Sequence, residues 1–243
     1  MTADVLSPDN LFLGDNLQEF YAFTEPWISG KLRRGDRMLD VGCGDGKLAM
    51  RLSKVVGLGE VVGFDVRETA IGMARSRAAG ANMQFVHRDA QDFDTVRALG
   101  TFDVVLARTS LHHFRDPIAA LKEYSSILNT GGRLLLVDID RESACCSILG
   151  FPVTLLITWV TVLRTLGWRR GWTAIRGMKY PSREWREHRM VDVAHRKKTG
   201  WYRFSDIKAK IRAAFPGAEV DRLASWGGLG GVHCMAYTKP QDG

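Results

Sequence analysis

Between residues 37 and 140, short apolar runs alternate with stretches of helical periodicity, and this alternation limits the possible folds more than any other feature of the chain. Strands that alternate with helices pack as a parallel sheet with helices on both faces. The sequence therefore predicts an α/β fold. The predicted strands in this part of the chain are residues 37–41, 60–66, 83–86, 102–107 and 133–139.

The segments between these strands are predicted helices. The helix after the first strand is expected to place Leu48, Leu52 and Val55 on its buried side. Further helices are predicted over 68–79 and 117–128, and the second of these begins with proline, which the first turn of a helix tolerates.

The alternation stops after residue 140 and resumes near the end of the chain. A helix is predicted over 204–215, followed by strands around 218–223 and 232–238. The stretch 141–203 is then a helical cap inserted between the fifth and sixth strands. We expect a single domain over residues 1–243.

The first 30 residues are also predicted to be helical, either packed on the edge of the sheet or placed over the ligand as a lid. With 243 residues, of which 45% are hydrophobic, the chain can bury a sizeable core. Its four cysteines form no CxxC pair and have no histidine at zinc spacing, so neither a metal site nor a disulfide framework is predicted. The N-terminus lacks a basic segment followed by an apolar run. We therefore expect a cytoplasmic protein.

A glycine-rich loop follows the first predicted strand. Gly42, Gly44 and Gly46 are spaced GxGxG and precede a helix. Glycines let backbone N–H groups approach a ligand closely, and a helix start favours negative charge. Lys47 stands where a dinucleotide-binding fold needs its third glycine or alanine, which argues against NAD.

Three carboxylates are expected at the same edge of the sheet as this loop. Asp65 ends the second strand, 19 residues past Gly46, where an acidic side chain in doubly wound sheets binds both ribose hydroxyls. Asp89 follows the third strand and suits the amino group of an adenine. Asp40 lies just before the loop and is expected to orient an amino-acid part of the ligand.

These residues resemble a known family. The segment 39–46 (LDVGCGDG), Asp65, the pair Asp89-Ala90 and the segment 111–114 (LHHF) are similar to class I S-adenosylmethionine-dependent methyltransferases, in particular the small-molecule group that includes the ubiquinone and menaquinone biosynthesis methyltransferases. The resemblance covers about residues 37 to 140. It implies a Rossmann-like, mostly parallel sheet of seven strands in the order 3-2-1-4-5-7-6, with strand 7 antiparallel, and S-adenosylmethionine as cofactor.

The resemblance also implies roles for single residues. The three glycines would pass under the methionine part of the cofactor, Asp65 would hold the ribose, Val66 would cover the adenine, and Asp89 with Ala90 would contact the adenine edge. The predicted cofactor-binding residues are Asp40, Gly42, Gly44, Gly46, Asp65, Val66, Asp89, Ala90 and Arg108.

Methyl transfer from a sulfonium needs alignment of the nucleophile and in some cases removal of a proton. Ligands bind beyond the carboxyl ends of the strands, so residues 108–114 are expected to face the transferred methyl. His112 matches the base-providing histidine of phosphoethanolamine methyltransferases, where a tyrosine assists, and Tyr21 is its proposed counterpart. The alternative is that both histidines of this motif only order the loop. The predicted acceptor-binding residues are His113, Trp159, His188 and Asp192.

The predicted cap carries two features that concern the acceptor. Residues 144–163 contain no charge, which favours a buried helix, an apolar acceptor such as a quinone or polyketide, or a peripheral contact with a membrane. We do not predict a membrane span, because Pro152 divides this run and the last strands must return to the sheet.

Residues 164–212 hold 15 Lys and Arg against four acidic residues. This excess of positive charge makes RNA an alternative acceptor. However, no NPPY-type tetrapeptide follows the fourth strand and no Pro-Cys nucleophile is present. A third alternative is a module that binds the cofactor without turnover.

Overall fold

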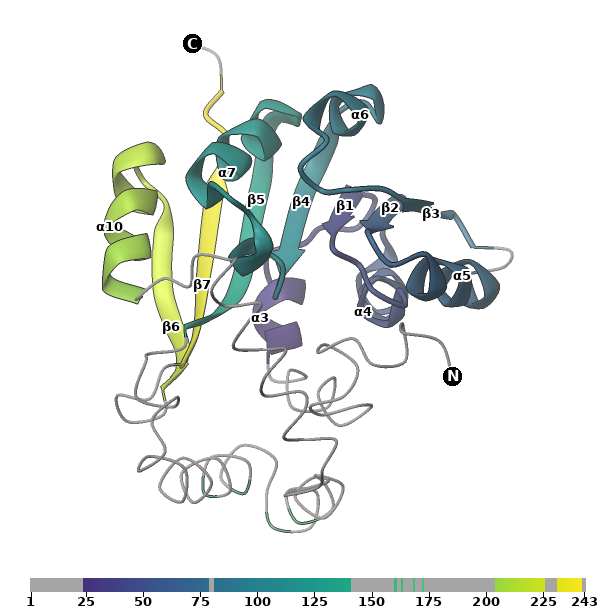
Figure 1. Cartoon of the computed structure of the whole chain (residues 1–243), viewed down its shortest axis with the longest axis horizontal. Coiled ribbons are helices and arrows are strands. Elements are labelled where there is room, and N and C mark those ends of the chain that lie inside the picture. Colours follow the sequence, from purple (N-terminus) through teal and green to yellow (C-terminus); the bar gives the residue numbers. More distant parts are fainter. Residues whose placement is uncertain are drawn as a thin grey trace.

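The computed structural model describes residues 24–78, 81–140, 204–225 and 231–241, together with residues 160, 163, 168 and 172. Its centre is one sheet of seven strands in the order β3-β2-β1-β4-β5-β7-β6 (Figure 1). The strands are β1 (Arg37–Val41), β2 (Glu60–Asp65), β3 (Met83–His87), β4 (Phe102–Arg108), β5 (Leu128–Asp140), β6 (Glu219–Ser225) and β7 (Gly231–Thr238). The predicted strand order is therefore confirmed.

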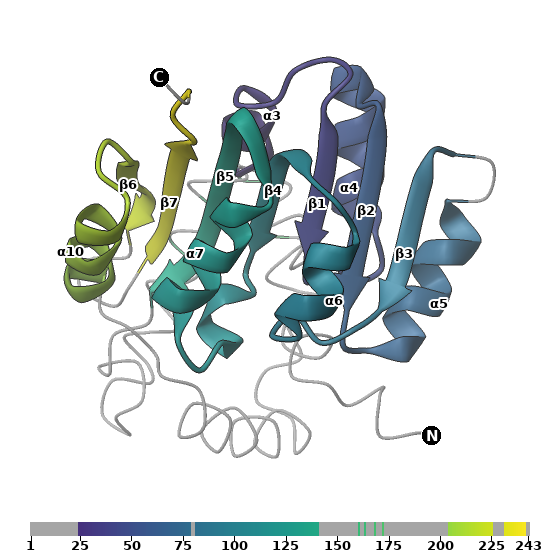
Figure 2. The ribbon, with the colours of Figure 1, turned by 90° about the horizontal axis from the view of Figure 1, so that it is seen from above.

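The strand directions also agree with the prediction. Strands β1 to β5 pair in parallel, whereas β7 lies antiparallel between β5 and β6. Figure 2 shows the consequence: the carboxyl ends of β1 to β5 share one edge of the sheet, and β7 points the opposite way. Asp140 at the end of β5 pairs with Gly231 at the start of β7.

Helices cover both faces of the sheet, because residues on a strand alternate between the two faces. Leu134 and Leu136 of β5 join one apolar cluster, and Leu135 and Val137 join the other. The helices on the first face are α6 (Phe93–Ala98), α7 (Pro117–Ser126) and α10 (Phe204–Ala214), and those on the second face are α3 (Glu25–Ser29), α4 (Lys47–Leu52) and α5 (Glu68–Arg77).

Two details of the helices differ from the predictions. Val55 is 75% exposed, although the pattern placed it on the buried side. The reason is that α4 gives way after Leu52 to the π-helical turn η3 (Ser53–Gly57), which breaks the regular helical periodicity. Helix α6 was not predicted. Asp92 caps it by accepting a hydrogen bond from the backbone N–H of Thr95 at 3.3 Å.

The N-terminal segment divides into two parts. Residues 24–29 pack on the sheet, since Ile28 is fully buried in the cluster that contains Met38 and Leu52. The lid was predicted for residues 1–30, of which residues 1–23 lie outside the described part of the chain, and it stays a prediction.

The cap at 141–203 lies almost entirely outside the described residues, as do the site residues Tyr21, Trp159, His188 and Asp192. Their predicted roles therefore remain predictions. Within the described ranges, no helix is long and apolar enough to cross a membrane.

Candidate functional site

The glycine loop joins the end of β1 to the start of α4 and is tied to the neighbouring strand. The backbone N–H groups of Gly42 and Cys43 both donate to the carbonyl of Phe64, at 2.9 and 3.0 Å. A Cβ on Gly42 would lie 2.9 Å from the Cβ of Ser110, and one on Gly46 would lie 2.9 Å from the ring of Phe85. Because both glycines also have φ above +70°, a side chain at either position would be excluded by space and by conformation.

Asp65 lies beside this loop and is nearly buried. Its Oδ2 accepts from the backbone N–H of Gly44 at 2.9 Å, and its Oδ1 accepts from the backbone N–H and Nε of Arg67 at 2.9 and 3.2 Å. A carboxylate offers about four acceptor positions, of which three are used here. A ribose diol would therefore take the remaining position and compete with Nε of Arg67, a residue that the sequence did not single out.

Asp40 is a buried carboxyl at the end of β1. Burial, which the charge of Arg108 opposes and the charge of Asp65 reinforces, raises its pKa to about 7. Its Oδ2 has no hydrogen-bond partner within the described residues. A buried acceptor of this kind suits an ammonium group. The predicted role of Asp40 in orienting an amino-acid part of the ligand stays a prediction.

The predicted adenine edge lies past the ends of β2 and β3. Val66 is 66% exposed, which leaves an apolar surface beside the carboxylate of Asp65. The carbonyl of Ala90 accepts a hydrogen bond from the hydroxyl of Tyr124 at 2.6 Å, and the carboxylate of Asp89 accepts from the backbone N–H of Gln91 at 2.9 Å. The structure thus brings the three predicted adenine-side residues to the edge that holds the glycine loop.

A buried histidine and a carboxylate form the other half of the site. His112 lies in the short helix η4 (Leu111–His113), and Asp138 lies on β5. Asp138 accepts from Nδ1 of His112 at 2.7 Å with Oδ1, and from the backbone N–H of His112 at 3.0 Å with Oδ2. The ring of His113 lies 4.1 Å from that of His112, measured between centroids. Sequence reasoning missed Asp138, although the end of β5 was expected at this edge.

The backbone before η4 is strained. Thr109 has φ +54°, which a β-branched residue rarely adopts. It follows β4 directly, and its N–H donates to the carbonyl of Val137 at 2.7 Å. Arg108 ends β4 next to it. This turn directs the chain from β4 into η4, and it therefore places His112 opposite Asp138.

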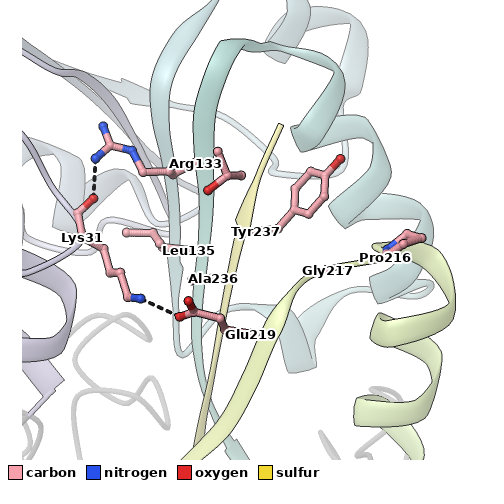
Figure 3. A pocket seen from close by; sticks show the side chains of 9 residues that line it. Lys31, Arg133, Leu135, Pro216, Gly217, Glu219, Ala236 and Tyr237 are labelled. Carbon is pink, nitrogen blue, oxygen red and sulfur yellow. Dashed lines mark hydrogen bonds and ion pairs between the residues drawn. The ribbon is translucent and has the colours of Figure 1, made fainter. Parts of the chain in front are cut away.

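All of these groups lie at the carboxyl ends of β1 to β5 or in the loops that follow them (Figure 2). A cavity of about 190 Å³ lies at the opposite edge, near the start of β5 and the end of β7 (Figure 3). The charges that line it are already paired: Lys31 with Glu219 at 2.5 Å, and Arg133 with Asp36 at 2.7 Å. The carboxyl edge instead gathers the glycine loop, the buried carboxyl of Asp40 and the contact between His112 and Asp138, and it is therefore the candidate site.

The chain is similar to known methyltransferases in sequence and in fold. A methyltransferase-domain family model matches residues 32–150. The 27-O-demethylrifamycin SV methyltransferase of Amycolatopsis mediterranei (strain S699) is 37% identical over 111 residues, which are 44% of this chain and 40% of that protein. The demethylmenaquinone methyltransferase of Staphylococcus aureus (strain JH9) is 34% identical over 114 residues, 46% of each protein. The matches thus span less than half the length of these two relatives.

A solved structure shows the same fold over nearly the whole chain. The plantazolicin methyltransferase, in complex with a pentazolic desmethylPZN analog and SAH, matches with a TM-score of 0.59 and 16% identity, covering 98% of this chain and 94% of that one. Topology, glycine loop and family model together define a methyltransferase domain of the class I fold. Residues 32–150 of this chain belong to the methyltransferase-domain family, and S-adenosylmethionine is its cofactor.

Proposed function

We propose that the chain transfers a methyl group from S-adenosylmethionine to a hydroxyl oxygen of an apolar or aromatic small molecule, with His112 as the catalytic base. The observation that carries this proposal is the buried contact between His112 and Asp138 at the edge of the sheet that holds the glycine loop. Without this pair, alignment alone would have to account for the reaction.

The geometry gives each member of the pair a role. An ionised carboxylate only accepts hydrogen bonds, so Nδ1 of His112 carries the proton and Nε2 keeps an acceptor lone pair. Nε2 would take the proton of the acceptor hydroxyl, while the bound cofactor would give up its methyl group to the hydroxyl oxygen and leave as the neutral thioether. Asp138 then faces the imidazolium, and its second hydrogen bond to the backbone of His112 holds the ring in place.

The cofactor, when bound, supplies an electrophilic methyl group on a sulfonium. The residues that we propose to hold it divide the work. The glycine loop passes under the methionine part, Asp40 contacts its ammonium group, and Asp65 binds the ribose. Val66, Asp89 and Ala90 contact the adenine, and Arg108 lies between the two halves of the site.

The acceptor class rests on the predicted cap. Residues 144–163 carry no charge, and two described residues of the cap are exposed apolar side chains, Val160 at 44% and Trp168 at 68%. The relatives named for rifamycin and demethylmenaquinone support a small-molecule acceptor. We further propose that the protein is cytoplasmic and reaches its acceptor at a membrane surface, since the basic stretch 164–212 suits anionic lipids.

One assay tests the proposal. Purified protein is incubated with methyl-labelled S-adenosylmethionine and lysate of the source organism, and the label is then partitioned between organic extract, nucleic acid, protein and aqueous fractions. We expect label in the organic extract, and loss of that label in Asp65→Ala and His112→Ala variants. Label in nucleic acid would contradict the acceptor class and support RNA instead, whereas a cofactor-bound protein without label in any fraction would support a module without turnover.

A further inference from the structure

Two loops that serve different parts of the proposed site are joined directly. The adenine loop, residues 89–92, follows β3, and the histidine loop, residues 110–115, follows β4 and carries His112. The side-chain carbonyl of Gln91 in the adenine loop accepts a hydrogen bond from the backbone N–H of Arg115 in the histidine loop, at 3.1 Å. The main chain of one loop is therefore held by a side chain of the other.

A second connection runs through Tyr124 of α7. Its hydroxyl donates to the carbonyl of Ala90 at 2.6 Å, and its ring packs edge to face against Phe114, with 6.1 Å between centroids. Burial raises the pKa of the Tyr124 hydroxyl far above its ordinary value, and the nearby charge of Asp89 adds to this. The hydroxyl therefore keeps its proton and remains a donor over the whole physiological range of pH.

The adenine loop is itself ordered by the residue predicted to meet the adenine. Oδ1 of Asp89 accepts from the N–H of Gln91 at 2.9 Å, and the carbonyl of Asp89 accepts from the N–H of Asp92 at 3.1 Å. A ligand that orders Asp89 and Ala90 therefore also orders the two contacts that hold the histidine loop, the one made by Gln91 and the one made by Tyr124. Phe114 and Arg115 directly follow the two histidines, so the effect reaches His112 within three residues.

We propose that Gln91 and Tyr124 are positioning residues that couple occupancy of the adenine edge to the order of the histidine loop. The inference rests on the proposed function, which places the adenine against Asp89 and Ala90. Cofactor binding then shifts the histidine loop toward its ordered state. By thermodynamic linkage, ordering of this loop raises the binding constant of the cofactor by the same factor as the cofactor raises the equilibrium constant for ordering the loop. Gln91 and Tyr124 act on the reaction only through this loop.

Hydrogen exchange of the full chain, measured by mass spectrometry with and without S-adenosylhomocysteine, tests the coupling. In the unmodified protein we expect S-adenosylhomocysteine to slow hydrogen exchange in the glycine loop and, by about fivefold, in the histidine loop. In Gln91→Ala and Tyr124→Phe, protection of the glycine loop should remain and protection of the histidine loop should be lost. Tyr237→Phe and Gln84→Ala are matched controls, since Tyr237 lines the cavity at the opposite edge and Gln84 is exposed on β3.

The outcomes separate the two proposals. Protection of both loops that persists in Gln91→Ala and in Tyr124→Phe would overturn the coupling and leave the proposed function standing. Protection of the glycine loop alone in the unmodified protein would do the same. Absence of protection in both loops would contradict the cofactor site of the proposed function, and the coupling with it. Should Tyr124→Phe fold poorly, Gln91→Ala decides, because Gln91 lies near the surface and its backbone contacts remain.

Discussion

The two halves of the site are built in different ways. On the cofactor side, the binding groups are main-chain groups of the glycine loop and two carboxylates at or near strand ends, Asp65 and Asp40. On the acceptor side, the central contact joins His112 and Asp138, which lie 26 residues apart on different elements. The first half follows from local sequence, whereas the second exists only once β4 and β5 are neighbours in the sheet.

The largest expected effect concerns the acceptor side. Asp138→Asn and His112→Gln should each lower kcat by about 10²- to 10⁴-fold, because the base loses either its orientation or its proton-accepting nitrogen. Calorimetry should show cofactor affinity lowered by no more than about fivefold, since neither side chain belongs to the cofactor half and only the coupling through the histidine loop reaches it. The double variant should be no slower than the worse single variant, because the two residues act as one unit. Full activity of Asp138→Asn would contradict the role of the contact between His112 and Asp138 in catalysis.

The next effect concerns the glycine loop. Gly46→Ala should lower the free energy of unfolding by about 2–4 kcal/mol, because its Cβ would press on the ring of Phe85 at a positive φ. Denaturant unfolding measures this. Gly72→Ala is the matched control: it has open space in α5 and should be neutral or stabilising by up to about 1 kcal/mol. Equal stability of the two variants would mean that the loop is not tied to the sheet as described.

A smaller effect is expected at the ribose position. Asp65→Asn should weaken cofactor binding about tenfold to a hundredfold, since hydrogen bonds to a charged group are lost. Calorimetric titration with S-adenosylhomocysteine provides the measurement. Glu68→Gln, at the start of α5 three residues further on, is a control for the change of charge. Unchanged cofactor affinity in Asp65→Asn would contradict the assignment of Asp65 as the residue that binds the ribose.

The smallest effect is a pH dependence within the cofactor half. The pKa of Asp40 is raised to about 7, so the carboxyl is mostly protonated at pH 6 and mostly ionised at pH 8. A cationic ammonium prefers the ionised form, and cofactor affinity should therefore rise about tenfold from pH 6 to pH 8. This rise should be absent in Asp40→Asn. Cofactor affinity that does not change with pH in the unmodified protein would contradict the proposed contact of Asp40 with the ammonium group.

The same raised pKa has a consequence for stability, with the sign fixed by linkage. The folded state holds the proton of Asp40 more tightly than the unfolded chain does. The contribution of protonated Asp40 to the free energy of unfolding is therefore fully present below the ordinary pKa of 3.8, and it is lost as pH rises through about 7. Thermal unfolding of the unmodified protein, compared with Asp40→Asn, should show this loss between pH 4 and pH 8.

The seven strands were predictable from their local pattern. Their order and the antiparallel last strand were predicted from the resemblance to class I methyltransferases, and both are confirmed. The glycine loop and Asp65 were found because each follows a strand end at a fixed spacing. Local pattern could not reveal the π-helical turn that exposes Val55, since a single extra residue in a turn leaves no periodic trace.

Two of the missed site residues share a physical reason. Asp138 and Thr109 owe their roles to the pairing of β4 with β5, which brings residues distant in sequence together. Arg67 was missed because its side chain turns back on Asp65, which spacing alone does not show. The roles of Tyr21, Trp159, His188 and Asp192 stay predictions, since these residues lie outside the described ranges.

The antiparallel β7 has a consequence for how such a protein can change. The chain leaves β5 at Asp140, and it enters β7 at Gly231, which pairs with Asp140 and also with Ser225 at the end of β6. The segments that follow β5 and β6 therefore both leave the sheet at one corner. Segments attached in this way are exchanged with little effect on the fold, since closing a longer or shorter excursion changes the free energy only slightly. Under the proposed function, a different acceptor could therefore be accommodated by replacing the segment that follows β5, while the cofactor half stays unchanged.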